Sequence, residues 1–595
     1  MKPVTISLLL LLCAMLARTA PGRQSPAESA PQPNREGAIT GRVVGPDGRP
    51  IAEARVLAIR VNVKSGSWQS AVVADDGSFK LTPLSSGTYA LLAAAPGYVP
   101  AEISIEKTIH YVGENVTLGL VKGGVITGRV TDETGEPIVG VNVTCQRLRD
   151  PDGRTTGSQI GLFDYGVGGA TDDRGIYRIF GLRPGGYIVS VRSNDGAQIR
   201  PDAPTYHPSA TRDTATEINL HSDEEVSGVD IRHRGDRGQI VSGSISGEPA
   251  SSIRVTVTLK GGEDGRFEDR SWTTGTGGFV FHGVPEGSYE LIATRGSEDG
   301  ETSSSARRLV SVSGGDAGGI ELKLMPHGSI AGRVVIEPST PASRCAIEGG
   351  PAEDQASGPI QERVRHRPVV EEVLLIAARD DPDRRAQVPW RRQGEMQGRS
   401  SNEKGEFLVE QLEAGRYHLI AFLPDDGWRI RAINRSAAGT AGRSGGATAA
   451  SSSVDVSRNG VTIKPGEKLF GLQVVVAEDA ARLSGRIVPK QKESKLPSSL
   501  RAYLIPAEAA MADDVIRYSE TDVGGDGSFD FKHLAPGKYW LHTRQVSEKE
   551  TNNDDAEPVV RNAIERAKLR REAAAARNEI ELKPCQRLKD YNLVR

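Results

Sequence analysis

The sequence predicts an all-β protein, a tandem array of about five Greek-key β-sandwich modules followed by one C-terminal helix. One template of five anchor residues occurs five times along the chain. The segments around it alternate apolar and polar residues with a period of two, which is typical of half-buried strands. The length of 595 residues also corresponds to about four domains, at ~150 residues each. Several separate hydrophobic cores are therefore expected.

The repeated template reads Gly-x-aromatic-x4-Leu/Val-x2-Gly-x-Tyr. Polar turns rich in Asp, Asn and Gly precede the aromatic residue, and the tyrosine shares a strand face with the aliphatic residue two positions later. We expect the aromatic residue and the tyrosine to be buried, and burial of each side chain to stabilise the fold by about 1.5–3 kcal/mol. The buried tyrosine hydroxyl then needs a hydrogen-bond partner. The aromatic and tyrosine anchors of the five copies are Phe79 and Tyr89, Tyr177 and Tyr187, Phe279 and Tyr289, Phe407 and Tyr417, and Phe529 and Tyr539.

A second shared segment, a period-2 strand interrupted by glycine, precedes each copy of the template. Its glycines are Gly41, Gly128, Gly243, Gly332 and Gly485, which follow one another at 87, 115, 89 and 153 residues. The modules are therefore about 90 residues long with insertions, the largest in the fourth. The predicted limits of modules 1 to 5 are 37–122, 123–235, 236–326, 327–478 and 479–595. Because the linkers are very short, we expect a rod or a gently bent string in which each module contacts the next.

The two ends of the chain differ from the repeats. Residues 1–20 combine an early lysine with a short apolar centre, which is typical of a secretory signal peptide and too short to span a bilayer. Cleavage after Ala20 and cleavage after Ala27 both stay open. Residues 21–36 are rich in Pro and Ser and are predicted to form a disordered lead-in. Residues 558–577 lack glycine and are dense in Ala, Arg and Glu, which predicts a helix inside module 5.

Modules 1 and 2 carry a strand, then Gly-Arg-Val, Asp-x-x-Gly-x-Pro-Ile or its shorter form, Asp-x-x-Gly-x-Tyr or the shorter Asp-x-Gly-x-Phe, and Leu-x-Pro/Ser-Gly-x-Tyr in similar order. This pattern resembles the carboxypeptidase regulatory-like domain, a transthyretin-like (prealbumin-like) seven-stranded sandwich related to collagen-adhesin B-type repeats. The resemblance is good in module 5 and partial in modules 3 and 4, which lack the Pro-Ile turn. It implies an exported bacterial protein from a superfamily described as having a carbohydrate-binding-like fold. Such a fold does not assign a ligand.

Charge and motifs argue against two classes of function. The 74 basic and 77 acidic residues give a net charge of −3, which offers no basic field for nucleic acid. A zinc carboxypeptidase needs His-x-x-Glu and a distant histidine around an open metal position. His221 and Glu224 match the first part, but they lie in an acidic connection between modules, and the repeats leave no room for a catalytic domain. We expect no catalytic residue, no cofactor and no metal.

Candidate binding residues are few. Trp68, Trp272 and Trp390 fall in the variable stretches of modules 1, 3 and 4, and we take them as candidate glycan contacts because sugars stack on flat exposed rings. The preferred interpretation is an exported non-enzymatic protein, periplasmic, surface-bound or secreted, with a structural or binding role at the cell envelope. A carbohydrate-binding accessory protein is the first alternative, and a zinc carboxypeptidase-like enzyme is the second. The expected partner is a polysaccharide or another envelope protein, without a transmembrane span in the mature chain; the oligomeric state stays open.

The cysteines predict one disulfide. Removal of the signal peptide takes Cys13 away and leaves Cys145, Cys345 and Cys585 in a compartment where disulfides form. Cys145 alternates with two valines on one strand face, as a buried thiol would. We therefore predict that Cys345 and Cys585 are bridged, which closes a loop of about 240 residues and ties the C-terminal tail to module 4.

Overall fold

The computed structural model of the protein describes residues 37–61, 68–100, 108–151, 168–192, 202–247, 254–261, 267–274, 277–295, 303–305, 307–337, 345, 369–380, 399–424, 426–436, 453–489, 496–497, 500–546 and 563–595. All of them belong to the compact unit Asn34–Arg595. The predicted signal peptide, the lead-in, Trp390 and the first residues of the predicted helix lie outside the described residues. We keep the module names proposed from the sequence.

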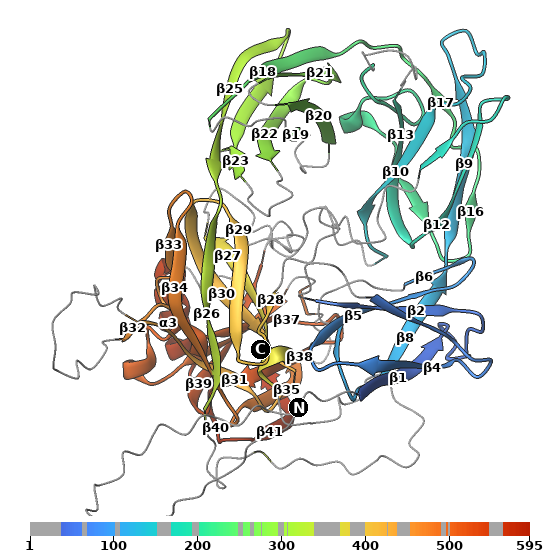
Figure 1. The fold of residues 1–595 in the computed structure, drawn as a ribbon. Helices are drawn as coiled ribbons and strands as arrows, with labels where there is room; N and C mark the ends of the chain where they lie inside the picture. Colours follow the sequence, from blue (N-terminus) through green and yellow to red (C-terminus); the bar gives the residue numbers. More distant parts are fainter. Residues whose placement is uncertain are drawn as a thin grey trace, which may run out of the picture. The chain divides into compact units, whose positions relative to one another are not determined.

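Modules 1 and 2 each contain two sheets (Figure 1). In module 1 one sheet has the order β4-β1-β8-β6 and the other β3-β2-β5-β7. The strands of module 1 are β1 (Gly37–Val44), β2 (Arg55–Arg60), β3 (Trp68–Val72), β4 (Ser78–Leu84), β5 (Thr88–Ala94), β6 (Tyr98–Pro100), β7 (Ile109–Tyr111) and β8 (Asn115–Lys122). In module 2 one sheet has the order β12-β9-β16, with β17 also on β9, and the other has β11-β10-β13-β14, with β15 on β13. Its elements are β9 (Gly124–Thr131), β10 (Asn142–Arg149), β11 (Gly168–Ala170), β12 (Ile176–Leu182), β13 (Gly185–Arg192), β14 (Thr205–Tyr206), η1 (Arg212–Thr214), β15 (Ile218–Leu220), β16 (Glu225–Val226) and β17 (Ile231–Arg232).

In module 3 the strands join into one sheet, β20-β19-β22-β23-β25-β18-β21, with β24 on β22. They are β18 (Gln239–Gly247), β19 (Arg254–Gly261), β20 (Phe267–Thr274), β21 (Gly278–Val284), β22 (Gly287–Arg295), β23 (Ser303–Ser305), β24 (Arg308–Val312) and β25 (Ala317–Pro326). The joining strand is β23, which pairs with both β22 and β25.

Modules 4 and 5 return to two sheets. Module 4 has the orders β29-β26-β34-β31-β32 and β28-β27-β30-β33, and module 5 has β38-β35-β41 and β37-β36-β39-β40. The elements of module 4 are β26 (Gly328–Ile336), η3 (Val370–Glu372), β27 (Leu374–Asp380), β28 (Arg399–Ser400), β29 (Glu406–Leu412), β30 (Gly415–Phe422), β31 (Arg429–Ser436), β32 (Ser453–Asp455), β33 (Val461–Ile463) and β34 (Lys468–Ala477). Those of module 5 are β35 (Ala481–Val488), β36 (Leu500–Pro506), η5 (Ala509–Met511), η6 (Val515–Arg517), β37 (Ser519–Asp522), β38 (Ser528–Leu534), β39 (Gly537–Gln545), α3 (Ala563–Ala576), β40 (Glu579–Leu582) and β41 (Arg587–Val594). The predicted all-β class of repeated sandwiches is confirmed.

The glycine that interrupts the first strand of every module faces the repeated aromatic residue across the sheet. On its other side the first strand runs parallel to a late strand of the module, for example β35 beside β41. A Cβ added at Gly485 would lie 3.0 Å from the Phe529 ring and far inside contact distance of the Tyr591 carbonyl oxygen. Only glycine fits between the ring and this carbonyl. The five register pairs are Gly41–Phe79, Gly128–Tyr177, Gly243–Phe279, Gly332–Phe407 and Gly485–Phe529.

The repeated tyrosines are all buried, at most 5% exposed, and so are the repeated aromatic residues. Each tyrosine hydroxyl donates to the backbone carbonyl four residues earlier, which satisfies the buried phenol. Burial raises the pKa of Tyr289 and of Tyr539 to about 12, so these hydroxyls stay protonated donors. The oxygen–oxygen distances are 2.8 Å for Tyr89 to Ser85, 2.7 Å for Tyr187 to Arg183, 2.7 Å for Tyr289 to Pro285, 2.8 Å for Tyr417 to Glu413 and 2.6 Å for Tyr539 to Ala535.

Helix α3 lies within the range predicted for it and packs on β36 and β39 of module 5. It buries Arg566, Leu569 and Ala573, which are spaced by three and four residues and so share one face of the helix. Leu569 and Ala573 join a small cluster with Tyr503. This cluster is separate from the main core of module 5, so the helix covers the outer face of a finished sandwich.

Neighbouring modules contact each other through polar groups. Lys122 pairs with Asp223 at 2.7 Å between modules 1 and 2, and Arg192 donates to the His282 carbonyl at 2.7 Å between modules 2 and 3. The Gly466 N–H donates to the Pro326 carbonyl at 2.9 Å between modules 4 and 3. These contacts agree with the short linkers of the sequence.

The predicted rod is wrong in one respect, because module 1 also packs against module 4. The outer face of its sheet β3-β2-β5-β7 is apolar, and part of it forms a cluster with Leu374 of module 4, against which Phe422 packs. The module 1 members of this cluster are Val61, Ala90, Ile109 and Tyr111, with Ile59 beside them. A strand with apolar residues on both faces needs a cover on its outer side. Neighbour-to-neighbour contacts alone would not provide this cover.

Candidate functional site

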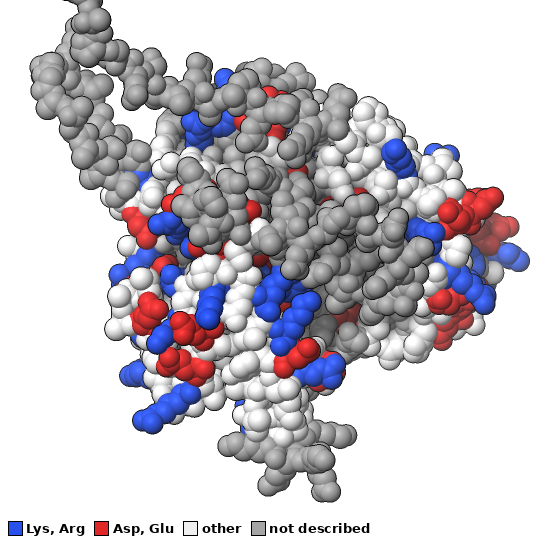
Figure 2. Space-filling view, turned by 90° about the horizontal axis from the view of Figure 1, so that it is seen from below, with Lys and Arg blue, Asp and Glu red and all other residues white. Residues whose placement is uncertain are grey.

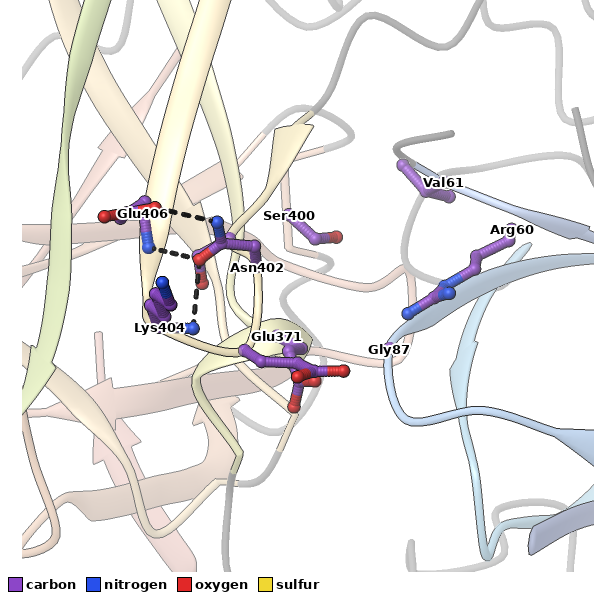
Figure 3. Close-up of a pocket in the computed structure, with 10 residues that line it drawn as sticks. Arg60, Val61, Gly87, Glu371, Ser400, Asn402, Lys404 and Glu406 are labelled. Atoms are coloured by element: carbon purple, nitrogen blue, oxygen red, sulfur yellow. Dashed lines mark hydrogen bonds between the residues drawn. The ribbon is translucent and has the colours of Figure 1, made fainter. Parts of the chain in front are cut away.

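A pocket of about 360 Å³ opens where module 1 meets module 4 (Figure 3). Module 1 contributes the end of β2 and the turn before β5. Module 4 contributes η3 and the segment from β28 to β29. This volume lies in the range of small-molecule sites. The lining residues are Arg60, Val61, Gly87, Glu371, Ser400, Ser401, Asn402, Glu403, Lys404 and Glu406.

The module 4 wall is held by a side-chain turn centred on Asn402. Its Oδ1 accepts from the N–H groups of Lys404 at 3.0 Å and Glu406 at 2.9 Å, and its Nδ2 donates to Glu406 Oε2 at 3.0 Å (Figure 3). Asn is favoured in such turns because its short amide bonds the backbone two residues on. Ser401 donates to the Val370 carbonyl. The turn and η3 therefore form one rigid wall.

The opposite wall presents Arg60, whose first role is structural. Its guanidinium donates to the Ser86 carbonyl at 2.6 Å, just before the second glycine of the template. The same bond occurs in three other modules, from Arg147 to Pro184, from Arg379 to Ala414 at 2.7 Å and from Arg517 to Pro536 at 2.9 Å. This arginine is not predicted from the sequence, because its place is set by strand register. Arg60, Arg147 and Arg379 each pair in register with the repeated tyrosine of their module.

Glu371 is the unusual side chain of the pocket. It is 6% exposed, and among the described residues its carboxylate accepts a hydrogen bond only from the backbone N–H of Glu371 itself. Desolvation and the nearby Glu403 raise its pKa, Arg60 across the pocket lowers it in part, and Glu372 raises it again. Sequence reasoning missed Glu371, since it lies beside a polar insertion and lines a pocket only because module 1 lies opposite.

The three candidate tryptophans are not brought together among the described residues. Trp68 begins β3, an edge strand of its sheet, and is 65% exposed. Trp272 lies in β20, the corresponding edge strand of module 3, and its side chain is outside the described residues. Trp390 lies outside them altogether. The glycan contact stays a prediction, with Trp68 as its placed member.

His221 and Glu224, which match part of a zinc-binding motif, are hydrogen-bonded to each other. Glu224 Oε2 accepts from the backbone N–H of His221 at 2.7 Å and lies 2.8 Å from His221 Nδ1. These two bonds, the backbone one first, lower the pKa of Glu224. Within the described ranges no group of three or more His, Cys, Asp or Glu side chains is placed to hold a metal ion. The described residues also contain no helix long and apolar enough to cross a membrane.

The junction of modules 4 and 5 carries the covalent link. Cys345 and Cys585 are joined by a disulfide with a Cα–Cα distance of 5.1 Å, and these are the two cysteines predicted to pair. Cys145 is free and buried, and burial raises the pKa of its thiol to about 12. Arg482 of module 5 bridges Asp426 of module 4 at 2.8 Å and Asp530 of its own module at 2.9 Å.

Charges on the surface are mixed. Figure 2 shows acidic and basic side chains interspersed over the coloured part of one face, in keeping with the balanced composition. Long-range attraction of a polyanion needs a field of one sign. A binding function is therefore to be sought at a local site.

Comparison with known proteins defines the class of the first two modules. Residues 38–119 and 125–221 each match the model of the carboxypeptidase regulatory-like domain. Modules 1 and 2 are thus each similar to that domain, in two tandem matches. No curated protein matches the chain.

Several solved structures are similar to parts of the chain. The minor pilin GBS52 of Streptococcus agalactiae is 16% identical over 33% of this chain and 96% of its own, with a TM-score of 0.19. The major pilin subunit BcpA of Bacillus cereus is 12% identical over 49% of this chain and 99% of its own, with a TM-score of 0.13. The Bacillus anthracis TIE protein is 16% identical over 49% of this chain, with a TM-score of 0.13, and the match spans about half, 51%, of that protein's chain. At these TM-scores the similarities carry no argument about function.

Proposed function

We propose that the protein is an exported, non-enzymatic array of β-sandwich modules with a structural or binding role at the cell envelope. The observation that supports it best is the way the modules are joined. Five separate cores are connected by ion pairs, hydrogen bonds, an apolar contact and, between modules 4 and 5, a disulfide. Such connections limit the relative motion of modules. This suits a protein that presents surfaces at set positions.

Export is supported by two independent features. The N-terminal segment has the pattern of a signal peptide. The Cys345–Cys585 bridge belongs to a kind of bond that persists in oxidising compartments and is rare in the cytosol. Together they favour a periplasmic, surface-bound or secreted protein.

Export is tested by expressing the full chain in a bacterial host and comparing it with Leu10→Arg, which places a charge in the apolar centre of the signal. We expect the unaltered chain outside the cytoplasm, shortened at its N-terminus, with Cys345 and Cys585 protected from alkylation. Leu10→Arg should stay in the cytoplasm with both thiols reactive. An unaltered chain that stays full-length in the cytoplasm would contradict the proposal.

Carbohydrate binding is the second candidate, and the exposure of Trp68 favours it. Val72 is 69% exposed at the other end of the same strand and, four residues on, shares its face, so the exposed face of β3 presents two apolar side chains with Ser70 between them. A glycan array should show saturable binding that Trp68→Ala removes. Phe180→Ala is the matched control, because Phe180 is 64% exposed on a strand of another module. Equal loss in both variants would speak against a sugar site at Trp68.

A further inference from the structure

The pocket between modules 1 and 4 contains a charge that the described residues do not neutralise. Glu371 lines the pocket and is 6% exposed, and in the described part of the chain its carboxylate is bonded only to the backbone N–H of Glu371 itself and forms no ion pair. Burying a carboxylate without a partner is costly, so each such group in a folded protein needs an explanation. A ligand that supplies the missing positive charge is one.

Three other polar groups of the pocket already have partners. Arg60 is bonded to the Ser86 carbonyl, Ser400 lies 3.1 Å from the Thr88 hydroxyl, and Ser401 is bonded to the Val370 carbonyl. The lining contains three glutamates against one arginine and one lysine, which leaves one negative charge in excess. Arg60 and Glu371 face each other from opposite walls (Figure 3) and form no ion pair. The module 4 wall therefore remains anionic.

The shape of the site favours an organic ligand over a metal ion. The volume of about 360 Å³ is far larger than one ion needs and lies in the range of small-molecule sites. No set of three His, Cys, Asp or Glu ligands is assembled among the described residues. A bare divalent cation would meet too few oxygen ligands, which number six to eight for calcium.

We propose that this pocket binds a small organic cation that carries a primary ammonium group, with Glu371 as its counter-ion. An ammonium has three donors and no acceptor, so it can bond Glu371 and a second carboxylate such as Glu403. Arg60 uses part of its five-donor fork on Ser86, and its remaining donors suit a hydroxyl on the same ligand. An amino sugar would use both walls, and a simple diamine only the acidic one. The inference deepens the binding role proposed above and rests on no other part of it.

The test is calorimetric titration of the full-length protein at neutral pH with two amines and their neutral counterparts. Glucosamine is compared with N-acetylglucosamine, and putrescine with 1,4-butanediol. We expect at least one amine to saturate the protein, with its neutral counterpart bound at least about tenfold more weakly. Binding of glucosamine alone identifies an amino sugar, and binding of putrescine as well identifies the ammonium as sufficient.

Variants separate a ligand contact from a structural role. Glu371→Gln keeps the shape and removes the charge, so amine binding should fall at least about tenfold while the melting temperature does not fall. Glu133→Gln, at an exposed turn of module 2, is the matched control and should bind as the unaltered protein does. Equal binding of neutral and charged probes, no binding of either amine, or full binding by Glu371→Gln would each overturn the inference. None of these outcomes touches the export test, so the two proposals can fail separately.

Discussion

The centre of each sandwich and the pocket on module 4 are built in opposite ways. The centre uses glycine, an aromatic ring and a tyrosine in the same register and with the same hydrogen bond five times. The pocket combines η3 and Glu371 with the Asn402 turn, whose hydrogen-bond pattern recurs at Asp172 of module 2, so η3 and Glu371 are what set the pocket apart. Residues at the centre are satisfied within their own module. Glu371 at the pocket forms no ion pair with a described residue, and its carboxylate is bonded only to its own backbone N–H. Repetition thus marks what the fold needs, and the unrepeated carboxylate without a counter-ion marks where a ligand is to be sought.

The largest expected effect is at the repeated glycine. Gly485→Ala would place a methyl group against the Tyr591 carbonyl and the Phe529 ring, so the parallel β35–β41 pair must move apart. We expect a loss of more than about 3 kcal/mol in the free energy of unfolding of module 5. Denaturant unfolding followed by circular dichroism measures it. Gly525→Ala is the control, since nothing lies within 4 Å of the added Cβ; similar losses in both variants would refute the steric argument.

The second-largest loss of stability is expected at the disulfide-linked junction of modules 4 and 5. Removing the disulfide with Cys345→Ser and Cys585→Ser together should cost about 2–4 kcal/mol, because 240 residues separate the two cysteines in sequence. Reducing agent should destabilise the unaltered protein and Cys145→Ala by the same amount and leave the double variant unchanged. If reducing agent has no effect on the unaltered protein, the bridge does not contribute to stability.

A smaller effect is expected at the repeated phenol. Tyr539→Phe leaves the Ala535 carbonyl without its 2.6 Å donor and should cost about 1–2 kcal/mol. The folded pKa of Tyr539, about 12, lies above the ordinary value of 10.0, so this tyrosine's contribution is present below pH 10 and is lost as the pH rises toward 12. An alkaline unfolding titration should therefore show a smaller loss for Tyr539→Phe. Tyr98 is a half-buried strand residue, and in the same alkaline titration Tyr98→Phe should lose as much stability as the unaltered protein does.

The smallest effect has the opposite sign and is at the pocket. The folded state raises the pKa of Glu371 above its ordinary value of 4.5, so folding binds the proton more tightly and the ionised group costs stability at neutral pH. Without ligand, Glu371→Gln should raise the melting temperature by about 1–3 °C at neutral pH. The gain should vanish in acid, where the carboxyl is protonated in both states. A lower melting temperature at neutral pH would mean that Glu371 has a stabilising partner, and the contrast between the pocket and the centre of each sandwich would then be wrong.

The sequence alone was enough to predict the repeated interior. Five anchors at constant offsets predict strands, turns and buried rings, because the period of two and the turn glycines act over a few neighbouring residues. The same local logic places Cys145 on a buried face and α3 near the C-terminus. The pairing of Cys345 with Cys585 followed from elimination among three cysteines, although 240 residues separate them.

Only the tertiary structure decided which modules meet and what their meeting creates. Nothing near Arg60 in sequence indicates that its strand end faces Glu371, since the two are brought together by the apolar cover that module 4 provides for module 1. The raised pKa of Glu371 reflects desolvation and the neighbouring Glu403, and Arg60 of module 1, far away in sequence, opposes the rise. Local patterns report which face of a strand is apolar. They do not report which partner covers it, because many apolar surfaces fit one another and the choice depends on the whole assembly of modules.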